Sequence, residues 1–379
     1  MSTPVALDPQ RQARARAYAR LRRRLFLAEI ILSGALLSAW LVFGWAGGLK
    51  TWLATLIQND WLLVLAFGAL FFLALEAAGL PLAYYAGFVL PRRYDQSTQT
   101  LAGWVKDQAL SLGLSALLGL PLLSGLYWLL RVTGDLWWLW AAGAYLLLSI
   151  LLSNLAPVVI MPLFNRYVPL GAEYADLARR LTALAERAGT RVAGVFRFDM
   201  SRRTRAANAA LTGLGRTRRI ILGDTLLEAF TPDEVEVVIA HELGHHVHRD
   251  IPLYLAFSAV STLAGLALAA EVLRAGTAAL GFAGPADIAA LPLLTLTLGA
   301  FGLILLPIQN AFSRWRERLA DQYALAATGR PADFINAFVR LANQNLAEVD
   351  PEPWVVFLFA SHPPIRERVA LAERFTPTA

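Results

Sequence analysis

The stretch TPDEVEVVIAHELGHHVHRD, residues 231–250, holds four of the five histidines in this 379-residue chain. Its first residues are typical of a helix N-terminus, because Thr231 can cap the helix, Pro232 suits the first position, and two acidic residues follow. We therefore predict a helix here. On such a helix His241 and His245 lie on one face, one turn apart.

Two imidazoles in this arrangement can bind one zinc ion. Glu242 follows the first histidine and is turned toward the same site. There it can take a proton from a zinc-bound water, whose pKa the metal lowers to about 7. The resulting hydroxide attacks a peptide carbonyl, and Glu242 passes the proton to the leaving nitrogen.

The alternative is a chance match in a surface helix with two solvated histidines. We favour zinc because the motif lies on a capped helix and contains most of the chain's few histidines. His246 is rotated by about 100° from its neighbour and cannot easily share the metal. His248 reads as a polar residue at the end of the helix, where a cation is favoured.

The composition indicates a membrane protein. Hydrophobic residues make up 57% of the chain and charged residues 16%, whereas soluble domains carry about 25% charged residues. The formal charge of +6 is explained by cytoplasmic loops and lipid headgroup contact, so we expect membrane lipid and no nucleic acid as partners. The lack of cysteine excludes disulfides and thiolate catalysis.

Six apolar segments are long enough to cross a bilayer as helices. The first follows the basic segment 11–24 and is too long for a cleaved signal peptide, so we expect it to be retained. The positive-inside rule places 91–108, 165–250 and both termini in the cytoplasm. The six predicted spans are roughly 25–48, 61–90, 109–132, 136–162, 253–276 and 287–312.

The long segment between the fourth and fifth spans is predicted to be a small α+β unit. An amphipathic helix should end at Gly189. Three short strands should follow, in 191–200, 208–215 and 218–224, before the histidine-rich helix. The fold class is therefore a mainly α polytopic membrane protein with a small zincin-like catalytic domain.

We expect four parts along the chain. They are a membrane domain of four spans (1–164), a cytoplasmic zincin domain (165–252), two further spans (253–312), and a helical C-terminal part that completes the zinc site (313–379).

Zinc in a catalytic site needs a third protein ligand and an open fourth position. SRWRERLADQYAL, residues 313–325, follows the last span and places Glu317 and Asp321 four residues apart. One of them can bind the metal while the other hydrogen-bonds the free nitrogen of a ligand histidine. The alternative is an ordinary charged helix in which neighbouring arginines pair with both carboxylates.

These motifs together resemble those of the integral-membrane zinc endopeptidases of the CAAX prenyl protease 1 family. HELGHH is similar to the HExxH of that family, and SRWRERLAD to its S-R-x-x-E-x-x-A-D. SHPPIRER (361–368) is similar to its S-H-P-P-x-x-E-R, and ANAALTGLG to its N-A-x-x-x-G-L. FVLPRRYDQSTQTLAGWVKDQ and PLFNRYVPL resemble its N-terminal membrane domain, so the resemblance spans roughly 60–375.

The resemblance implies that Glu317 is the third ligand of one Zn2+ per chain and that Asp321 supports a ligand histidine. It implies that His362 and Arg368 face the substrate or the tetrahedral intermediate. Asn208 and the backbone after it would align the peptide. A ring of membrane helices around a large water-filled chamber is also implied, although we count six spans where eukaryotic members have seven.

The leading hypothesis is a membrane zinc endopeptidase of the CAAX prenyl protease type. The alternatives are a heat-shock-type quality-control metalloprotease of the same clan and a transporter or scaffold with a vestigial zinc site. The FVLPRRYDQSTQT segment disfavours the first alternative, and the intact Glu242 disfavours the second. The Arg, Ala and Leu content is typical of a bacterial protein, so we expect the bacterial inner membrane. Because bacteria generally lack prenylated CAAX proteins, the substrate is expected to be another peptide or protein.

Overall fold

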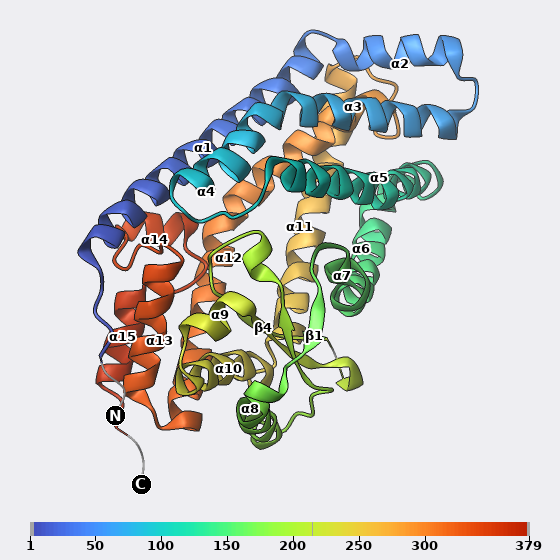
Figure 1. The fold of residues 1–379 in the computed structure, drawn as a ribbon. Coiled ribbons are helices and arrows are strands. Elements are labelled where there is room, and N and C mark those ends of the chain that lie inside the picture. The colour runs from blue at the N-terminus through green and yellow to red at the C-terminus, as the bar shows by residue number, and fades with distance from the viewer. Residues whose placement is uncertain (1–3, 214, 377–379) are drawn as a thin grey trace.

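Figure 1 shows the computed structural model, which describes residues 4–213 and 215–376. Within these residues, six helices are long and apolar enough to cross a membrane by length and composition. They correspond to the six predicted spans. Their helices are α1 (Pro9–Val42), α3 (Asp60–Tyr84), α5 (Leu101–Val132), α6 (Trp137–Leu155), α11 (Asp250–Ala279) and α12 (Leu291–Thr328).

The first span differs from its predicted bounds of 25–48. Helix α1 begins at Pro9, where the side chain of Asp8 caps it, and it continues through the basic segment. Arginine and alanine are good helix formers, so this segment extends the helix beyond the apolar run. At the other end Gly44 adopts a φ of 68° and interrupts the helix. The short α2 (Trp45–Leu56) follows as a separate element.

Two of the spans contain a π-helical turn close to their C-terminal end. In the second span, Pro81 lies inside α3 and the irregular turn, Tyr85–Val89, follows it. Another such turn, Ala156–Ile160, follows α6 and includes Pro157. A π-turn widens the helix locally, and it is typical near functional sites. The short helices α4 (Leu90–Arg93) and α7 (Met161–Phe164) complete these spans.

The segment after α7 folds around a four-stranded sheet with strand order β1-β2-β4-β3. Strands β2 and β4 are parallel and the other neighbours are antiparallel. Because β3 stands at the end of the order, it is an edge strand. Three of the strands were predicted. The fourth, β1, has only three residues, too few for an alternating pattern to reveal it. The strands are β1 (Tyr167–Pro169), β2 (Val195–Phe198), β3 (Ala209–Thr212) and β4 (Arg219–Gly223).

Helices from the middle and from the end of the chain pack on this sheet around one apolar core. That core joins Leu181 and Ile220 to Ile239, and also to Leu325 and Phe334 from the C-terminal part. The segments predicted as separate parts, 165–252 and 313–379, therefore share one core. The helices around this core include α8 (Ala175–Arg187), α9 (Asp224–Ala229), α10 (Pro232–Val247), α13 (Pro331–Gln344) and α15 (Ile365–Glu373). The remaining elements of the described chain are α14 (Pro353–Phe359) and 3-10 turns at Gly134–Leu136, Ala172–Tyr174, Met200–Arg202, Gly215–Thr217 and Ile288–Ala290.

A cavity of about 700 Å³ lies among α5, α6, α11 and α12. Most of its lining is apolar, with Phe257 and Phe301 among the walls and Gln309 as a polar member. Tyr254 also lines it and donates a hydrogen bond of 3.2 Å to Ser313, one turn before Glu317 on α12. The cavity therefore reaches from the membrane helices toward the predicted zinc ligands.

Candidate active site

Helix α10 begins as predicted, with Thr231 as its N-cap. The Thr231 hydroxyl accepts a hydrogen bond from the Glu234 backbone at 3.3 Å, and the Glu234 carboxylate accepts one from the Thr231 backbone at 2.8 Å. This reciprocal pair satisfies two amides that the first turn of a helix leaves without partners. The start of α10, and therefore the register of its histidines, is fixed by these local contacts.

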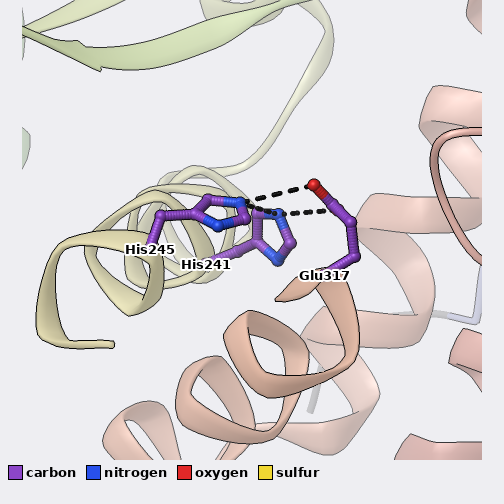
Figure 2. A group of neighbouring side chains, drawn as sticks. All are labelled: His241, His245 and Glu317. Carbon is purple, nitrogen blue, oxygen red and sulfur yellow. Dashed lines mark hydrogen bonds and ion pairs between the residues drawn. The ribbon is translucent and has the colours of Figure 1, made fainter. Parts of the chain in front are cut away.

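Helix α10 lies unusually close to α12. A Cβ atom added to Gly244 would be 2.8 Å from the Cα atom of Ala320 and 3.0 Å from its carbonyl oxygen. Glycine removes the side chain that would hold the two backbones apart. This approach brings His241 and His245 on α10 opposite Glu317 on α12 (Figure 2).

The three side chains converge on one point. The Nε2 atoms of His241 and His245 are 3.2 Å apart. Glu317 Oε2 is 3.3 Å from Nε2 of His241, and Oε1 is 3.5 Å from Nε2 of His245. Tetrahedral zinc with bonds of about 2.0–2.1 Å separates its ligand atoms by about 3.3 Å. The spacing therefore fits a zinc ion at the centre.

The hydrogen bonding around Glu317 supports the same conclusion. Its Oε2 atom is buried and has no hydrogen-bond partner among the described residues. A buried carboxylate oxygen without a donor is costly, and a cation would remove that cost. Two imidazoles and one carboxylate are also a donor set that catalytic zinc uses.

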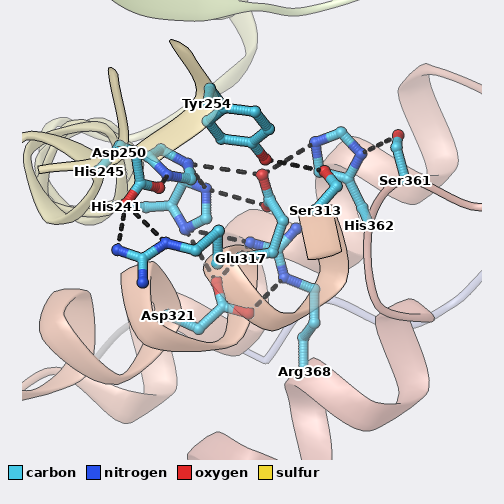
Figure 3. Close-up of polar contacts among 11 residues, drawn as sticks. His241, His245, Asp250, Tyr254, Ser313, Glu317, Asp321, Ser361, His362 and Arg368 are labelled. Carbon is cyan, nitrogen blue, oxygen red and sulfur yellow. Dashed lines mark hydrogen bonds and ion pairs between the residues drawn. The ribbon is translucent and has the colours of Figure 1, made fainter. Parts of the chain in front are cut away.

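Each of the two candidate ligand histidines is oriented by a buried carboxylate (Figure 3). His241 Nδ1 lies 2.9 Å from Asp321 Oδ1, and His245 Nδ1 lies 2.7 Å from Asp250 Oδ2. With Nδ1 bonded in this way, each ring turns its Nε2 atom toward the common point. The contact of Asp321 agrees with the supporting role that the resemblance implied, whereas Asp250 was not predicted.

If α10 continued without a break, the Asp250 side chain would point away from the site. It follows His245 by five positions, which on a helix is a rotation of about 140°. The chain breaks at Arg249, whose φ is 55°, and α11 starts at Asp250 in a new direction. A positive φ at an arginine has no sequence signal, so spacing alone could not identify this partner.

Arg368 lies behind Asp321. Its Nε donates to Asp321 Oδ2 at 2.9 Å, its Nη2 also bonds that carboxylate, and only 7% of the residue is exposed. Its guanidinium carbon stands 3.7 Å from the centroid of the Phe338 ring. Arg368 therefore supports Asp321, and the substrate contact that the resemblance implied stays a prediction.

Glu242 and His241 have shifted pKa values. Burial raises the pKa of Glu242, while the neighbouring histidines and the Leu211 amide of β3 lower it less. A carboxylate with a raised pKa is a stronger proton acceptor, which suits a general base. Burial lowers the pKa of His241, but the neighbouring carboxylates of Asp321 and Glu317 outweigh it and raise that pKa to about 9. A metal must therefore displace a proton here.

His362 stands at the open edge of the cluster. Its Nε2 atom is 3.4 Å from Glu317 Oε1, and 61% of its side chain is exposed. Its Nδ1 atom lies 2.9 Å from the Ser361 hydroxyl, which holds the ring in place (Figure 3). The structure thus brings the predicted His362, from a distant part of the chain, beside the candidate ligand Glu317.

The remaining predicted residues lie outside the ligand cluster. Asn208 is exposed at the start of β3, and its carbonyl accepts a hydrogen bond of 2.9 Å from Gly223. Its role toward substrate stays a prediction, and Leu214 of the same motif lies outside the described residues. The Nε2 atom of His246 lies 3.4 Å from Nη1 of Arg218, and the His248 ring contacts the Tyr323 ring.

Comparison with known proteins covers nearly the whole chain. Residues 5–166 match the model "CAAX prenyl protease N-terminal, five membrane helices", and residues 172–376 match peptidase family M48. The uncharacterized metalloprotease YhfN of Bacillus subtilis (strain 168) is 32% identical over 97% of this chain and 87% of its own. CAAX prenyl protease 1 of Saccharomyces cerevisiae is 30% identical over 76% of this chain and 67% of its own.

Comparison with a solved structure indicates the same family. The crystal structure of S. mikatae Ste24p matches with a TM-score of 0.83 and 25% identity, covering 97% of this chain and 91% of that chain. Together, the matches and the fold define an integral membrane zinc metalloendopeptidase. The chain belongs to peptidase family M48, and its N-terminal part makes it a member of the CAAX prenyl protease type. The predicted family, fold class and enzyme class are confirmed.

Proposed function

We propose that His241, His245 and Glu317 bind one zinc ion per chain and that this centre hydrolyses peptide bonds in peptide or protein substrates. The observation that carries the proposal is that donor atoms of the three residues all lie within 4.8 Å of one another. The chain between His245 and Glu317 passes through α11 and the apolar first part of α12, which belong to the fifth and sixth candidate spans. Zinc held in this way would lower the pKa of a coordinated water to about 7 and would polarise a carbonyl.

Glu242 is the general base in this proposal. Its carboxylate takes a proton as the nucleophile attacks and returns it to the leaving nitrogen. The pKa of Glu242, raised by burial, favours that transfer. His362, at the exposed edge of the cluster, donates a hydrogen bond to the oxygen on which negative charge develops.

The edge strand β3 is proposed to align the substrate. It pairs with β4 on one side, and no strand of the described chain pairs with its other side. The Leu211 amide of β3 already contacts the Glu242 carboxyl. An extended peptide added to this edge would pass in front of the ligands, with Asn208 at the start of the strand.

We further propose that the protein lies in a bacterial cell membrane with the catalytic unit on the cytoplasmic side. The basic segments 11–24 and 165–250, and the arginines after the sixth span, support this orientation. The similarity to a Bacillus subtilis protein supports the bacterial setting. Membrane lipid then surrounds the apolar helices, and the substrate reaches the site from the cytoplasm or from the bilayer.

The test uses the purified full-length chain and a peptide library whose products are sequenced. Metal removal with phenanthroline should abolish cleavage, and one equivalent of zinc should restore it. Glu317→Ala should lose both zinc and cleavage. The control is Glu367→Ala, which removes an exposed carboxylate that pairs with Arg318. Cleavage by fully metal-depleted protein would refute the proposal.

A further inference from the structure

We propose that Asp250 and Arg316 form a positioning pair that holds the second zinc ligand, His245, and ties it to two membrane spans. The inference rests on the proposed zinc centre. The pair is distinct from the Asp321–Arg368 pair behind His241, and it acts through His245 without touching substrate or metal.

The contacts of Asp250 use both of its oxygens. Oδ2 accepts the 2.7 Å hydrogen bond from His245, and Oδ1 accepts one of 2.8 Å from Nε of Arg316. Nη2 of Arg316 also bonds Asp250 and donates to the His248 carbonyl at 2.8 Å. Asp250 and Arg316 are each only 4% exposed. A buried carboxylate with every bond directed in this way has little freedom to move.

The backbone is arranged to deliver Asp250 to His245. Helix α10 ends at Val247, Arg249 takes a left-handed conformation, and Asp250 opens α11. An arginine rarely adopts that conformation, so the surrounding contacts must hold it. The Arg316 bond to the His248 carbonyl is one such contact, because it ties the end of α10 to α12.

The two ligand histidines now have matching supports. His241 is held by Asp321 and then Arg368, and His245 is held by Asp250 (Figure 3). Arg316 in turn holds Asp250. In both cases a carboxylate fixes the proton on Nδ1, which leaves the Nε2 lone pair free for a metal. The arginine neutralises the buried carboxylate and fixes its direction.

The positions of all three proposed ligands consequently depend on helix α12. It supplies Glu317 itself, Asp321 to His241, and, through Arg316, the orientation of Asp250 at His245. Because Asp250 is the first residue of α11, the geometry at His245 depends on how α11 and α12 lie together. A role in folding alone would stabilise the protein without changing its zinc affinity.

The test measures zinc affinity of the purified full-length protein by competition with a chromophoric chelator. The absorption spectrum of the cobalt-substituted protein is measured beside it. Asp250→Ala should weaken zinc binding by about 10–100-fold and alter the cobalt spectrum. Asp250→Asn keeps an acceptor for Nδ1 and should recover most of that affinity. Arg318→Gln, which removes an exposed charge from the same helix, is the control and should change neither.

The decisive comparison is a double-mutant cycle. Arg316→Gln should weaken zinc binding severalfold in the wild type and clearly less beside Asp250→Ala, since most of its effect passes through Asp250. Equal effects in both backgrounds, or zinc affinity of Asp250→Ala within twofold of wild type, would overturn the positioning role. If Asp250→Ala does not fold, Arg316→Gln alone decides: zinc affinity of that variant within twofold of wild type would overturn the positioning role. A wild type that binds no zinc would instead overturn the proposed function.

Discussion

Replacing Gly244 with alanine should damage the metal site more than the fold. The new Cβ would lie 2.8 Å from Cα of Ala320, where ordinary contact begins at 3.4 Å. The difference, 3.4 minus 2.8, requires α10 and α12 to separate by at least 0.6 Å. Ligand distances tolerate only about ±0.2 Å. His241 and His245 would therefore move out of range of Glu317.

The fold itself should survive this change. Overpacking costs about 1–3 kcal/mol, but alanine in a helix is favoured over glycine by about 1 kcal/mol. The net loss of stability is then about 2 kcal/mol or less. Zinc affinity should fall by at least about tenfold, comparable to losing a supporting carboxylate. Chelator competition and thermal unfolding, measured on the same preparation, give both quantities.

Gly276→Ala is the matched control. Its Cβ would also meet an atom at 2.8 Å, but that atom is the end of the flexible Leu293 side chain. Gly276 also lies on α11, which carries none of the three proposed ligands. This variant should keep wild-type zinc affinity. Equal zinc affinity of Gly244→Ala and wild type would show that the close helix contact does not set the ligand geometry.

Three further predictions concern the exposed histidine, the topology and acid stability. His362→Ala should lower turnover on the order of a hundredfold with zinc content unchanged, as measured by steady-state kinetics and metal analysis, because it removes an oxyanion donor; loss of stoichiometric zinc would contradict that role. The chain has no cysteine, so a single introduced cysteine reports the side of the membrane on which it lies. Glu173→Cys and Ala283→Cys, both at exposed positions, should react with an impermeant maleimide from opposite faces of membrane vesicles. Labelling of both from the same face would refute the topology. The hydrogen bond from Arg180 lowers the pKa of Asp233. This pair therefore stabilises the fold above about pH 4, and its contribution disappears as the pH falls further. Asp233→Asn should make the thermal unfolding midpoint depend less on pH in the acid range, and an unchanged dependence would argue against the pairing.

The sequence was most informative where the determinants are local. The HExxH spacing and the capping residues at Thr231 specify the α10 helix and the facing pair His241 and His245 without reference to the rest of the chain. Composition and length similarly predict the six spans. The ends of the first span were wrong because the basic residues after Pro9 continue the helix, and because Gly44 ends it early.

Tertiary contacts could not be predicted in the same way. Asp250 reaches His245 only through the left-handed Arg249. The burial of Arg368 behind Asp321 depends on how α15 packs, which neither spacing nor charge pattern encodes. The close contact of α10 with α12 is likewise visible only in three dimensions. These contacts determine which carboxylate supports which ligand.

The most direct test of the central claim is zinc content and peptide cleavage measured together on purified Glu242→Gln. The claim is that Glu242 moves the proton while His241, His245 and Glu317 hold the metal. The variant should therefore retain one zinc per chain, and its cleavage should fall to the background of metal-depleted wild type. Turnover comparable to wild type in a zinc-replete Glu242→Gln sample would contradict the account.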